Sequence, residues 1–418
     1  MSRERCCRKS TSTPCLALLT LFLALSPLQP SLKAQELKEQ ERANGVDYFI
    51  GAGALYDDNL FRQPAGSTLS SGATHLHRQD LIERVSAGIR GSWALAQQSF
   101  ELKAHGDDNR FEQNDQLNNI SGSAALTWDW RVGHRWTGQL GADYARALAN
   151  FANNLVLDKD LLSQRGSFAG ATFELGPHWF LHGDVRWSSG EHSAAVRRVD
   201  DDNIRTQKFG VELKLSSTDS LGWNYRHANA SFAGGLLLNG VNFDRNYDES
   251  ASAVWVKYAL TGKTDLDCEG GYVRRDYPNA AIGNFTGATG RGTLNWHPGA
   301  KTAVAITGWR DLNAYIDAQS NYFVTRGASI TPSWAPTEKI TTSVAVSWER
   351  QNYIGSNPTV AAGEFRRDTV KSAQASATYV PARALELDIT YRREQRDSSL
   401  APLTYVDNLA VLGVRFTF

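Results

Sequence analysis

The sequence has almost no cysteine that a fold could use. Three of its four cysteines, Cys6, Cys7 and Cys15, lie near the start, and only Cys268 lies in the body of the chain. A single cysteine cannot form an internal disulfide, and there is no Cys/His framework of the kind that binds zinc. We therefore expect a fold without disulfides, and we expect neither a metal site nor a cofactor.

Long hydrophobic runs are also scarce. After residue 35 no stretch is apolar enough for a membrane-spanning helix, which needs ~20 residues. The run LALLTLFLAL at 16–25 is too short, follows the basic segment MSRERCCRKS and precedes the small residues of SLKAQ near Ala34. This pattern predicts a secretory signal peptide at 1–35, followed by a short periplasmic segment at 36–46.

An excess of one charge is absent as well. The chain of 418 residues has 44 basic and 44 acidic residues, and removing the segment before residue 35 leaves 39 and 43. Nothing in this balance indicates a nucleic-acid-binding protein. No Pro/Ser-rich linker divides the chain, so we expect one large domain at 47–418.

What the sequence does have is apolar and polar residues that alternate with a period of two. In ALELDITYRRE, apolar Leu385, Leu387, Ile389 and Tyr391 alternate with Glu386, Asp388, Thr390 and Arg392. Eighteen such segments begin near residues 47, 80, 98, 119, 134, 162, 178, 204, 219, 246, 263, 284, 300, 320, 338, 365, 384 and 404. An even number of strands is typical of bacterial single-chain barrels. The fold class is therefore predicted to be all-β: a transmembrane antiparallel up-and-down β-barrel of about 18 strands in the bacterial outer membrane, surrounded by lipid.

The connections and the tryptophans support the same interpretation. Short turns such as GPH, TGK and PAR alternate with longer polar loops, as periplasmic turns alternate with extracellular loops. Most tryptophans lie near the short turns, whereas Trp187, Trp309 and Trp348 lie toward the opposite strand ends and Trp255 lies in mid-strand. We expect two aromatic belts at the membrane interfaces. A soluble β-sandwich or propeller explains these features less well.

The chain ends in VLGVRFTF, an alternation that places Leu412, Val414, Phe416 and Phe418 on the lipid side and Arg415 in the lumen. The pattern resembles the C-terminal signal by which outer-membrane barrels are recognised by the barrel assembly machinery. Gly413, Phe416 and Phe418 are the residues that match it.

A barrel of this size can enclose an aqueous lumen. The alternation assigns basic side chains to the lumen, and the candidates that line it are Arg84, Arg90, Lys103, Arg186, Lys208, Lys214, Arg226, Arg291, Arg392 and Arg415. One hypothesis is that these cations pair with inward-facing acids across the wall. The other is that a basic stripe guides an anionic polymer. We favour pairing for most of them.

The segment GALYDDNLFRQPAG at 53–66 leaves the first strand and begins the first long loop. Its core consists of Tyr56, Asp57, Asp58, Asn59, Leu60, Phe61 and Arg62. Two carboxylates and an amide in this position can cap a turn or bind a cation, and a turn is the better interpretation. GDDNRFEQ at 106–113 repeats the Asp-Asp-Asn triplet at another strand end.

The YDDNLFR stretch and the hairpins that follow it resemble outer-membrane polysaccharide-biosynthesis proteins of the EpsL type, which are encoded with exosortase-linked exopolysaccharide systems. The similarity extends loosely over the mature chain and is carried mainly by its first hundred residues. It implies a conduit for exopolysaccharide export, with polysaccharide and the periplasmic and inner-membrane synthesis and export proteins as partners. It supplies no catalytic residues.

Two alternatives stay open. A general or sugar-selective diffusion porin would fold a long loop inward, and the candidates are 58–79 and 228–244, the latter with the apolar stretch FAGGLLLNG. An outer-membrane enzyme is less favoured, because the sequence has no G-x-S-x-G and no H-E-x-x-H. His178 and His182 lie too far apart on a strand to share a metal. We expect no enzyme activity.

Overall fold

The computed structural model describes residues 44–71, 74–152, 157–234, 236–238, 241–243, 245–278, 284–314, 322–354 and 366–418. The expected signal peptide lies outside the described residues. So does the expected periplasmic segment up to residue 43, and the first strand begins at Asn44. Among the described residues, no helix is long and apolar enough to cross a membrane.

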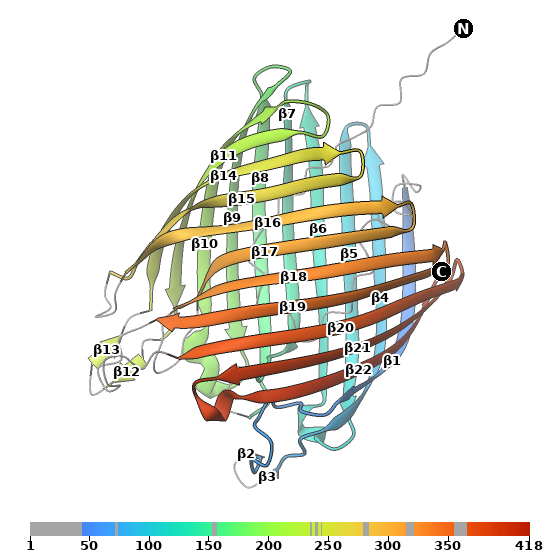
Figure 1. The fold of residues 1–418 in the computed structure, drawn as a ribbon, viewed down its shortest axis with the longest axis vertical. Helices are drawn as coiled ribbons and strands as arrows, with labels where there is room; N and C mark the ends of the chain where they lie inside the picture. Colours follow the sequence, from blue (N-terminus) through green and yellow to red (C-terminus); the bar gives the residue numbers. More distant parts are fainter. Residues whose placement is uncertain are drawn as a thin grey trace. The chain divides into compact units, whose positions relative to one another are not determined.

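Eighteen long antiparallel strands form one sheet, as the alternation predicts. They are β1 (Asn44–Asp57), β4 (Asp80–Leu95), β5 (Gln98–Phe111), β6 (Asn119–Val132), β7 (Trp136–Leu148), β8 (Leu161–Glu174), β9 (Trp179–His192), β10 (Asp202–Lys214), β11 (Ser220–Phe232), β14 (Tyr247–Thr261), β15 (Thr264–Asp276), β16 (Phe285–Gly299), β17 (Thr302–Ala314), β18 (Tyr322–Thr337), β19 (Ile340–Ile354), β20 (Arg367–Ala382), β21 (Leu385–Ser398) and β22 (Tyr405–Thr417). Consecutive long strands pair with each other around the sheet, so the topology is up-and-down (Figure 1).

The sheet closes into a barrel because β1 pairs with β4 on one side and with β22 on the other. Phe49 lies opposite Thr417 and Asp57 lies opposite Leu409 along this seam. Past the end of the β1–β22 ladder, the backbones of Tyr48 and Phe418 exchange two hydrogen bonds of 2.9 Å. Closure leaves no free strand edge, which is what a sheet surrounded by hydrocarbon requires.

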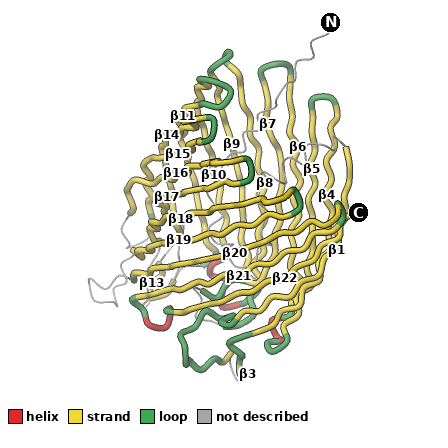
Figure 2. The backbone as a smooth tube through the Cα atoms, turned by 45° about the vertical axis from the view of Figure 1, so that its right-hand side comes forward, coloured by secondary structure: helices red, strands yellow, loops and turns green. Residues whose placement is uncertain are grey.

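The connections differ at the two ends of the strands (Figure 2). One end has tight turns, and in two of them Ala96 (φ 55°) and Gly133 (φ 61°) adopt the left-handed conformation. The other end has longer connections with small elements of their own: the hairpins β2 (Ser70–Ser71) with β3 (Thr74–His75) and β12 (Leu236–Leu238) with β13 (Val241–Phe243), and the 3-10 helices η1 (Asp115–Leu117), η2 (Ala195–Asp200) and η3 (Ala401–Leu403). In the usual arrangement of such barrels this second end is extracellular.

The two faces of the wall have opposite character. We call outer the alternate positions that carry large exposed apolar side chains, such as Ile50, Ile306 and Leu412. The positions between them form the inner face. Arg186 on β9 reaches across β8 to bond Asp143 on β7, and such a contact over an intervening strand is made on the concave side of a sheet. The sheet thus has a hydrophobic exterior and a polar interior.

Most tryptophans lie on the outer face, as a membrane-interface belt requires. Trp136, Trp179 and Trp334 are exposed near the tight turns. The sequence predicts that Trp309 belongs to an aromatic belt at the membrane interface. This prediction is wrong, because the side chain of Trp309 faces the inside of the barrel. Its indole fills the space where a side chain at position 327 would lie, so only glycine fits there. The missing side chain on the neighbouring strand explains why the ring fits inside the barrel.

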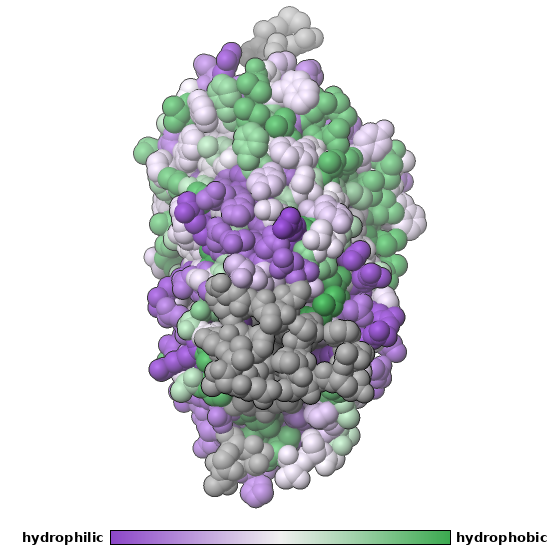
Figure 3. All heavy atoms as spheres, turned by 90° about the vertical axis from the view of Figure 1, so that its left-hand side faces the viewer, coloured by the Kyte–Doolittle hydropathy of each residue, from purple (hydrophilic) through white to green (hydrophobic). Residues whose placement is uncertain are grey.

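Hydrophilic residues gather where the longer connections lie. In the view that faces β12 and β13, they gather just above the centre of the surface and along its flanks, and hydrophobic residues are frequent toward its top and sides (Figure 3). The distribution fits a polar barrel mouth with a hydrophobic wall around it.

Candidate functional site

All the basic residues predicted to line the lumen lie at inner-face positions of their strands. They are Arg84, Arg90, Lys103, Arg186, Lys208, Lys214, Arg226, Arg291, Arg392 and Arg415. The strand register fixes this placement. Whether each of them contacts a passing solute stays a prediction.

Three of these cations form close ion pairs across the wall. Arg186 Nη2 lies 2.8 Å from Asp143, and Arg291 Nη2 lies 2.7 Å from Asp311. Arg226 Nη2 lies 2.5 Å from the buried Glu249, and Glu249 also binds Arg275. Each pair joins neighbouring or next-neighbouring strands, so it neutralises charge and ties the wall together.

The remaining cations are also engaged. Several face carboxylates: Lys103 lies 2.5 Å from Glu101, Arg392 lies 3.4 Å from Asp407, Arg415 lies 3.4 Å from Glu386, and Lys208 is the cross-strand neighbour of Asp184. Arg90 is the cross-strand neighbour of Asp47, Arg84 donates to Asn109, and Lys214 lies 4.1 Å from the ring centre of Phe180. Each of these basic side chains therefore has an acidic, polar or aromatic neighbour in the wall.

The YDDNLFR stretch forms a buried turn at the mouth, by which we mean the end of the inner face where the longer connections lie. Arg62 is 5 % exposed and has a φ of 55°. Its Nη1 donates to both oxygens of Asp57 (3.0 and 3.1 Å), and lies 2.9 Å from Asp407 on β22. Burial alone would lower the pKa of Arg62, but the two carboxylates more than offset this, so its pKa lies above the ordinary value.

The amide of Asn59 organises the same turn. Its Nδ2 donates to the carbonyls of Gln63 (2.9 Å) and Val406 (2.8 Å), and its Oδ1 accepts from Arg78 (3.1 Å). Asp58 accepts two hydrogen bonds from Asn408, at 2.7 and 2.6 Å. The side chains therefore cap the turn and join it to β22.

Carboxylate oxygens of Asp57, Asp58 and Asp407 lie within 4.8 Å of one another, close enough for a cation site. Arg62 supplies a cation to two of the three, and Asn408 binds the third. The arrangement is therefore a turn with an internal counter-ion, which is the interpretation that the sequence favours.

Two long connections meet at the mouth. Phe61 from the β1–β4 connection is fully buried and packs on Phe151 from the β7–β8 connection, with ring centres 4.9 Å apart. Arg396 on β21 donates to the carbonyl of Ala152 (2.5 Å), although β22, β1, β4, β5 and β6 separate β21 from β7. The β7–β8 connection thus reaches inward across the mouth.

Sequence patterns did not predict a second buried network at the mouth, which is centred on Asp368. Asp368 accepts from Arg366 (2.6 Å), from Arg396 (2.8 Å) and from the hydroxyl of Ser398 (2.5 Å). Tyr353 packs under Arg366, whose Cζ lies 4.0 Å from the ring centre. The only signal in the sequence is that these charges occupy inner positions at strand ends, which does not say that they touch.

The base of the β7–β8 connection is held by Asp160. Its carboxylate accepts from the backbone of Ala194 (3.0 Å) and lies 2.6 Å from Nδ1 of His192, and its carbonyl accepts from Ala149 (2.8 Å). Burial would raise the pKa of Asp160, but the bonds from His192 and Ala194 outweigh it, so its pKa lies below the usual value.

The predicted assembly residues lie on the seam strand. Phe416 and Phe418 are exposed on the outer face, and Gly413 lies between them and the middle of β22. The ring of Phe418 stacks on that of Tyr48, with centres 6.1 Å apart. Recognition by the assembly machinery stays a prediction.

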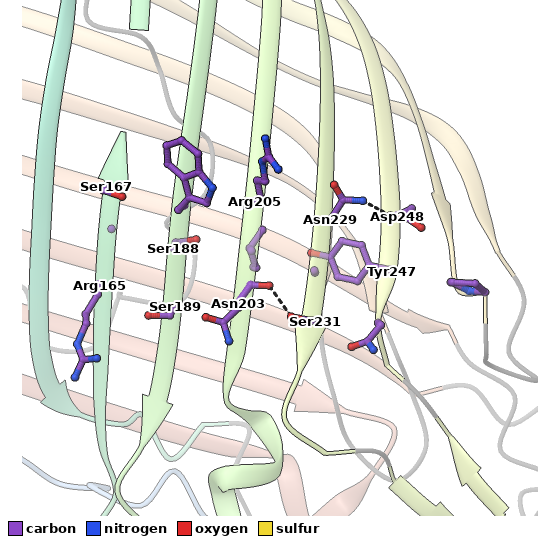
Figure 4. A pocket seen from close by; sticks show the side chains of 16 residues that line it. Arg165, Ser167, Ser188, Ser189, Asn203, Arg205, Asn229, Ser231, Tyr247 and Asp248 are labelled. Atoms are coloured by element: carbon purple, nitrogen blue, oxygen red, sulfur yellow. Dashed lines mark hydrogen bonds between the residues drawn. The ribbon is translucent and has the colours of Figure 1, made fainter. Parts of the chain in front are cut away.

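A groove of about 490 Å³ lies near the mouth ends of β8 to β14 (Figure 4). Its polar side chains come mainly from outer-face positions, among them Arg165, Trp187, Arg205 and Asn229. The groove is therefore not part of the barrel interior.

Two further features singled out in the sequence are the FAGGLLLNG stretch and the histidine pair His178 and His182. The stretch FAGGLLLNG forms β12 in its middle, and Gly235, Asn239 and Gly240 lie outside the described residues, so a gate there stays a prediction. His178 bonds the carbonyl of Lys214, while His182 bonds Thr172 and Glu212. The two histidines have separate partners.

Known proteins resemble this chain in fold and, over part of its length, in sequence. Residues 238–418, which include β14 to β22, match the family model described as "Putative beta-barrel porin 2". No curated protein sequence matches the chain. This partial match agrees with the closed barrel of eighteen strands. The chain is a porin-like β-barrel of the outer membrane.

Solved structures show the same architecture. OpdK, an outer-membrane protein from Pseudomonas aeruginosa, has a TM-score of 0.50 and 12% identity over 90% of this chain and 98% of its own. A BenF-like porin from Pseudomonas fluorescens Pf-5 has a TM-score of 0.51 and 8% identity over 89% and 99%. OccK2 from P. aeruginosa, solved with glucuronate, has a TM-score of 0.50 and 10% identity over 90% and 98%. At these identities the similarity concerns the fold alone.

Proposed function

We propose that this porin-like barrel is a diffusion channel that admits small hydrophilic solutes through the outer membrane. The observation that carries the proposal is the contact of Phe61 with Phe151, because it brings two long connections together inside the mouth of a closed barrel. An inward constriction lets small solutes pass and holds back large ones.

The basic side chains of the inner face do not support selectivity for anions. A basic stripe that guides an anionic polymer requires cations without counter-ions. Here Arg186, Arg226 and Arg291 each bind a carboxylate of the wall. Paired charges keep the interior hydrated, and the pairing leaves these three cations little attraction for a passing anion.

Exopolysaccharide export is the alternative, and the resemblance carried by YDDNLFR favours it. In that case the partners would be polysaccharide and the synthesis and export proteins of the periplasm and inner membrane. The buried turn around Arg62 weighs against a wide conduit, because it occupies the mouth with a network that is costly to break.

The first experiment measures permeation by the purified protein. We expect ion conductance in planar bilayers without a preference for anions, and swelling of liposomes in monosaccharides but not in long polysaccharides. Vanillate and glucuronate are useful test solutes, because barrels of the same fold were solved with them. A barrel that inserts without conducting would contradict the proposal.

A paired substitution tests the constriction. Replacing Phe61 and Phe151 with Ala removes the contact between the two connections and should raise single-channel conductance and the size limit for sugars. The control is Phe173→Ala, which removes a comparable aromatic contact, with Trp136 at 4.6 Å, near the tight turns. Equal conductance in both variants would show that the mouth does not limit flow.

A deletion strain separates the two functions. A diffusion channel predicts normal polymer at the cell surface and reduced uptake of small solutes. An exporter predicts normal polymer synthesis with less polymer at the surface, and that result would replace our proposal.

A further inference from the structure

Three arginines lie side by side on the outer face of the barrel. Arg310 on β17 is directly opposite Arg326 on β18, and Arg326 is directly opposite Arg350 on β19. We call these residues the outer arginine row. Neighbouring strands are ~4.8 Å apart, so three guanidinium groups share a strip about 10 Å wide.

The register places this row on the hydrophobic side of the wall. Ile306 and Ile330, at the corresponding positions nearer the tight turns, are each 45 % exposed, and Trp348 beside Arg350 is 46 % exposed. Residues two or four apart on a strand share a face. The row therefore stands on the exterior, not in the lumen.

Within the described part of the chain, none of the three arginines has an ion-pair or hydrogen-bond partner. The Nε of Arg310 is buried and has no acceptor. Asp397 lies in line with Arg350 two strands away on this face, and Lys371 and Gln395 already engage it. Like charges directly opposite each other destabilise a sheet, and no described residue supplies the row with a counter-ion.

The height of the row restricts what can supply that counter-ion. Arg326 lies eight residues from Trp334, which is exposed close to the tight turn of the β18–β19 hairpin. Eight residues span about 26 Å along a strand, or about 20 Å across the membrane at the usual tilt. The apolar band of such barrels is ~25 Å tall, so the row lies near its outer edge, at the depth of lipid headgroups.

From this placement we infer that the outer arginine row binds the phosphate groups of lipopolysaccharide in the outer leaflet. Arginine forms short, charge-assisted hydrogen bonds with phosphate, and a lipid places its phosphates beside its acyl chains, as the row lies beside Ile306, Ile330 and Trp348. A soluble anion would have to enter this interface without acyl chains to pack on the apolar wall. A second copy of the chain would bring more arginines to the same strip.

The test compares lipid binding by wild-type protein and by a variant with Arg310, Arg326 and Arg350 changed to Gln. Both are purified in detergent as folded barrels, and lipopolysaccharide bound per barrel is measured by native mass spectrometry during a titration. We expect the triple variant to lose affinity by on the order of tenfold or more, given the strength of hydrogen bonds to charged groups. Lipid A without phosphates should bind both proteins equally.

Arg274→Gln is the matched control, because Arg274 is an exposed arginine of β15 with its own partner, Asp276, at 2.8 Å. It should bind lipopolysaccharide as the wild type does. Equal affinity of wild type and triple variant would overturn the inference. So would an equal loss in the control. Inorganic phosphate that displaced the lipid at comparable concentration would instead identify a site for free anions and would also reject it.

Thermal stability gives a second, independent readout. Without lipopolysaccharide the triple variant should unfold at the same or a higher temperature than the wild type, because like-charge repulsion is removed. With lipopolysaccharide the wild type should gain stability and the variant should not. A variant that is less stable than the wild type under both conditions would show that the row is structural. Channel conductance plays no part in this result, so the proposed function can fail while the lipid site stands.

Discussion

At the scale of single residues, Arg62 shows how one side chain holds the mouth together. A non-glycine residue in the left-handed region costs of order 1 to 3 kcal/mol, and the surroundings must compensate for it. The compensation is the bond from its guanidinium to Asp57 and Asp407, which joins the β1–β4 connection to β22. The turn conformation and the ion pair therefore depend on each other.

Replacing Arg62 with Ala should destabilise the barrel. It removes the cation from the buried Asp57 and leaves Asp407 with Arg392 alone, and breaking a buried pair in this way costs about 3 to 5 kcal/mol. Denaturant unfolding in detergent measures the loss.

Arg110→Ala is the control for this substitution. Arg110 pairs with Asp108 at 2.9 Å in an exposed position, so its loss should cost less than about 1 kcal/mol. If the two variants unfold alike, the network around Arg62 contributes no special stability.

The sequence predicts the inner or outer side of a strand residue but not its distant partner. Arg186 and Arg291 could be assigned to the lumen because the period of two fixes the side. The ion pair of Arg62 with Asp407 could not be predicted from the sequence, because it depends on β1 and β22 meeting at the seam. The outer arginine row was missed too, although a charge in an apolar register was visible at each of its positions.

At the scale of elements, the β7–β8 connection is the clearest case of a loop that sequence patterns leave undetermined. Alternation and turn residues predict the start of each long strand to within a few residues. The path of the connection depends instead on contacts with β21 and with the β1–β4 connection, through Ala152 and Phe151. Such contacts join parts of the chain that only the closed barrel brings together.

Acid should loosen this connection through Asp160. Because the pKa of Asp160 is lowered in the folded protein, its contribution is complete above the usual value of 3.8 and is lost as the pH falls through the lower folded value. We expect more current fluctuation in single channels at about pH 3 than at about pH 6.

Asp160→Asn isolates this carboxylate from the many others that titrate in acid. The amide cannot carry the charge that pairs with His192, so the variant should fluctuate at both pH values. A variant as quiet as the wild type near neutral pH would assign the acid response to other groups.

At the scale of the whole molecule, the barrel depends on a seam between β1 and β22. Phe418 takes part through two backbone hydrogen bonds with Tyr48 and through stacking of the two rings. The even strand count and the apolar pattern of VLGVRFTF made closure predictable. The exact register of the seam was not, since it is fixed by how all the strands stagger.

Replacing Phe418 with Glu should reduce the amount of assembled barrel in the outer membrane. The change puts a charge on the outer face, removes the stacking on Tyr48 and alters the proposed assembly signal. Heat-modifiable mobility on gels and abundance in membrane fractions measure the effect. Thr417→Glu, which adds the same charge on the inner face, should assemble better; equal assembly of both would remove the special role of the final aromatic ring.

The seam also governs when the protein can first act as a pore. Because its two strands come from opposite ends of the sequence, an emerging polypeptide exposes two unpaired ribbon borders during its entire passage through the periplasm. Until the barrel is closed, these unpaired strand edges can pair with other chains. We therefore expect that periplasmic chaperones bind the unfolded chain and that the barrel closes in a single late step, when β1 and β22 pair.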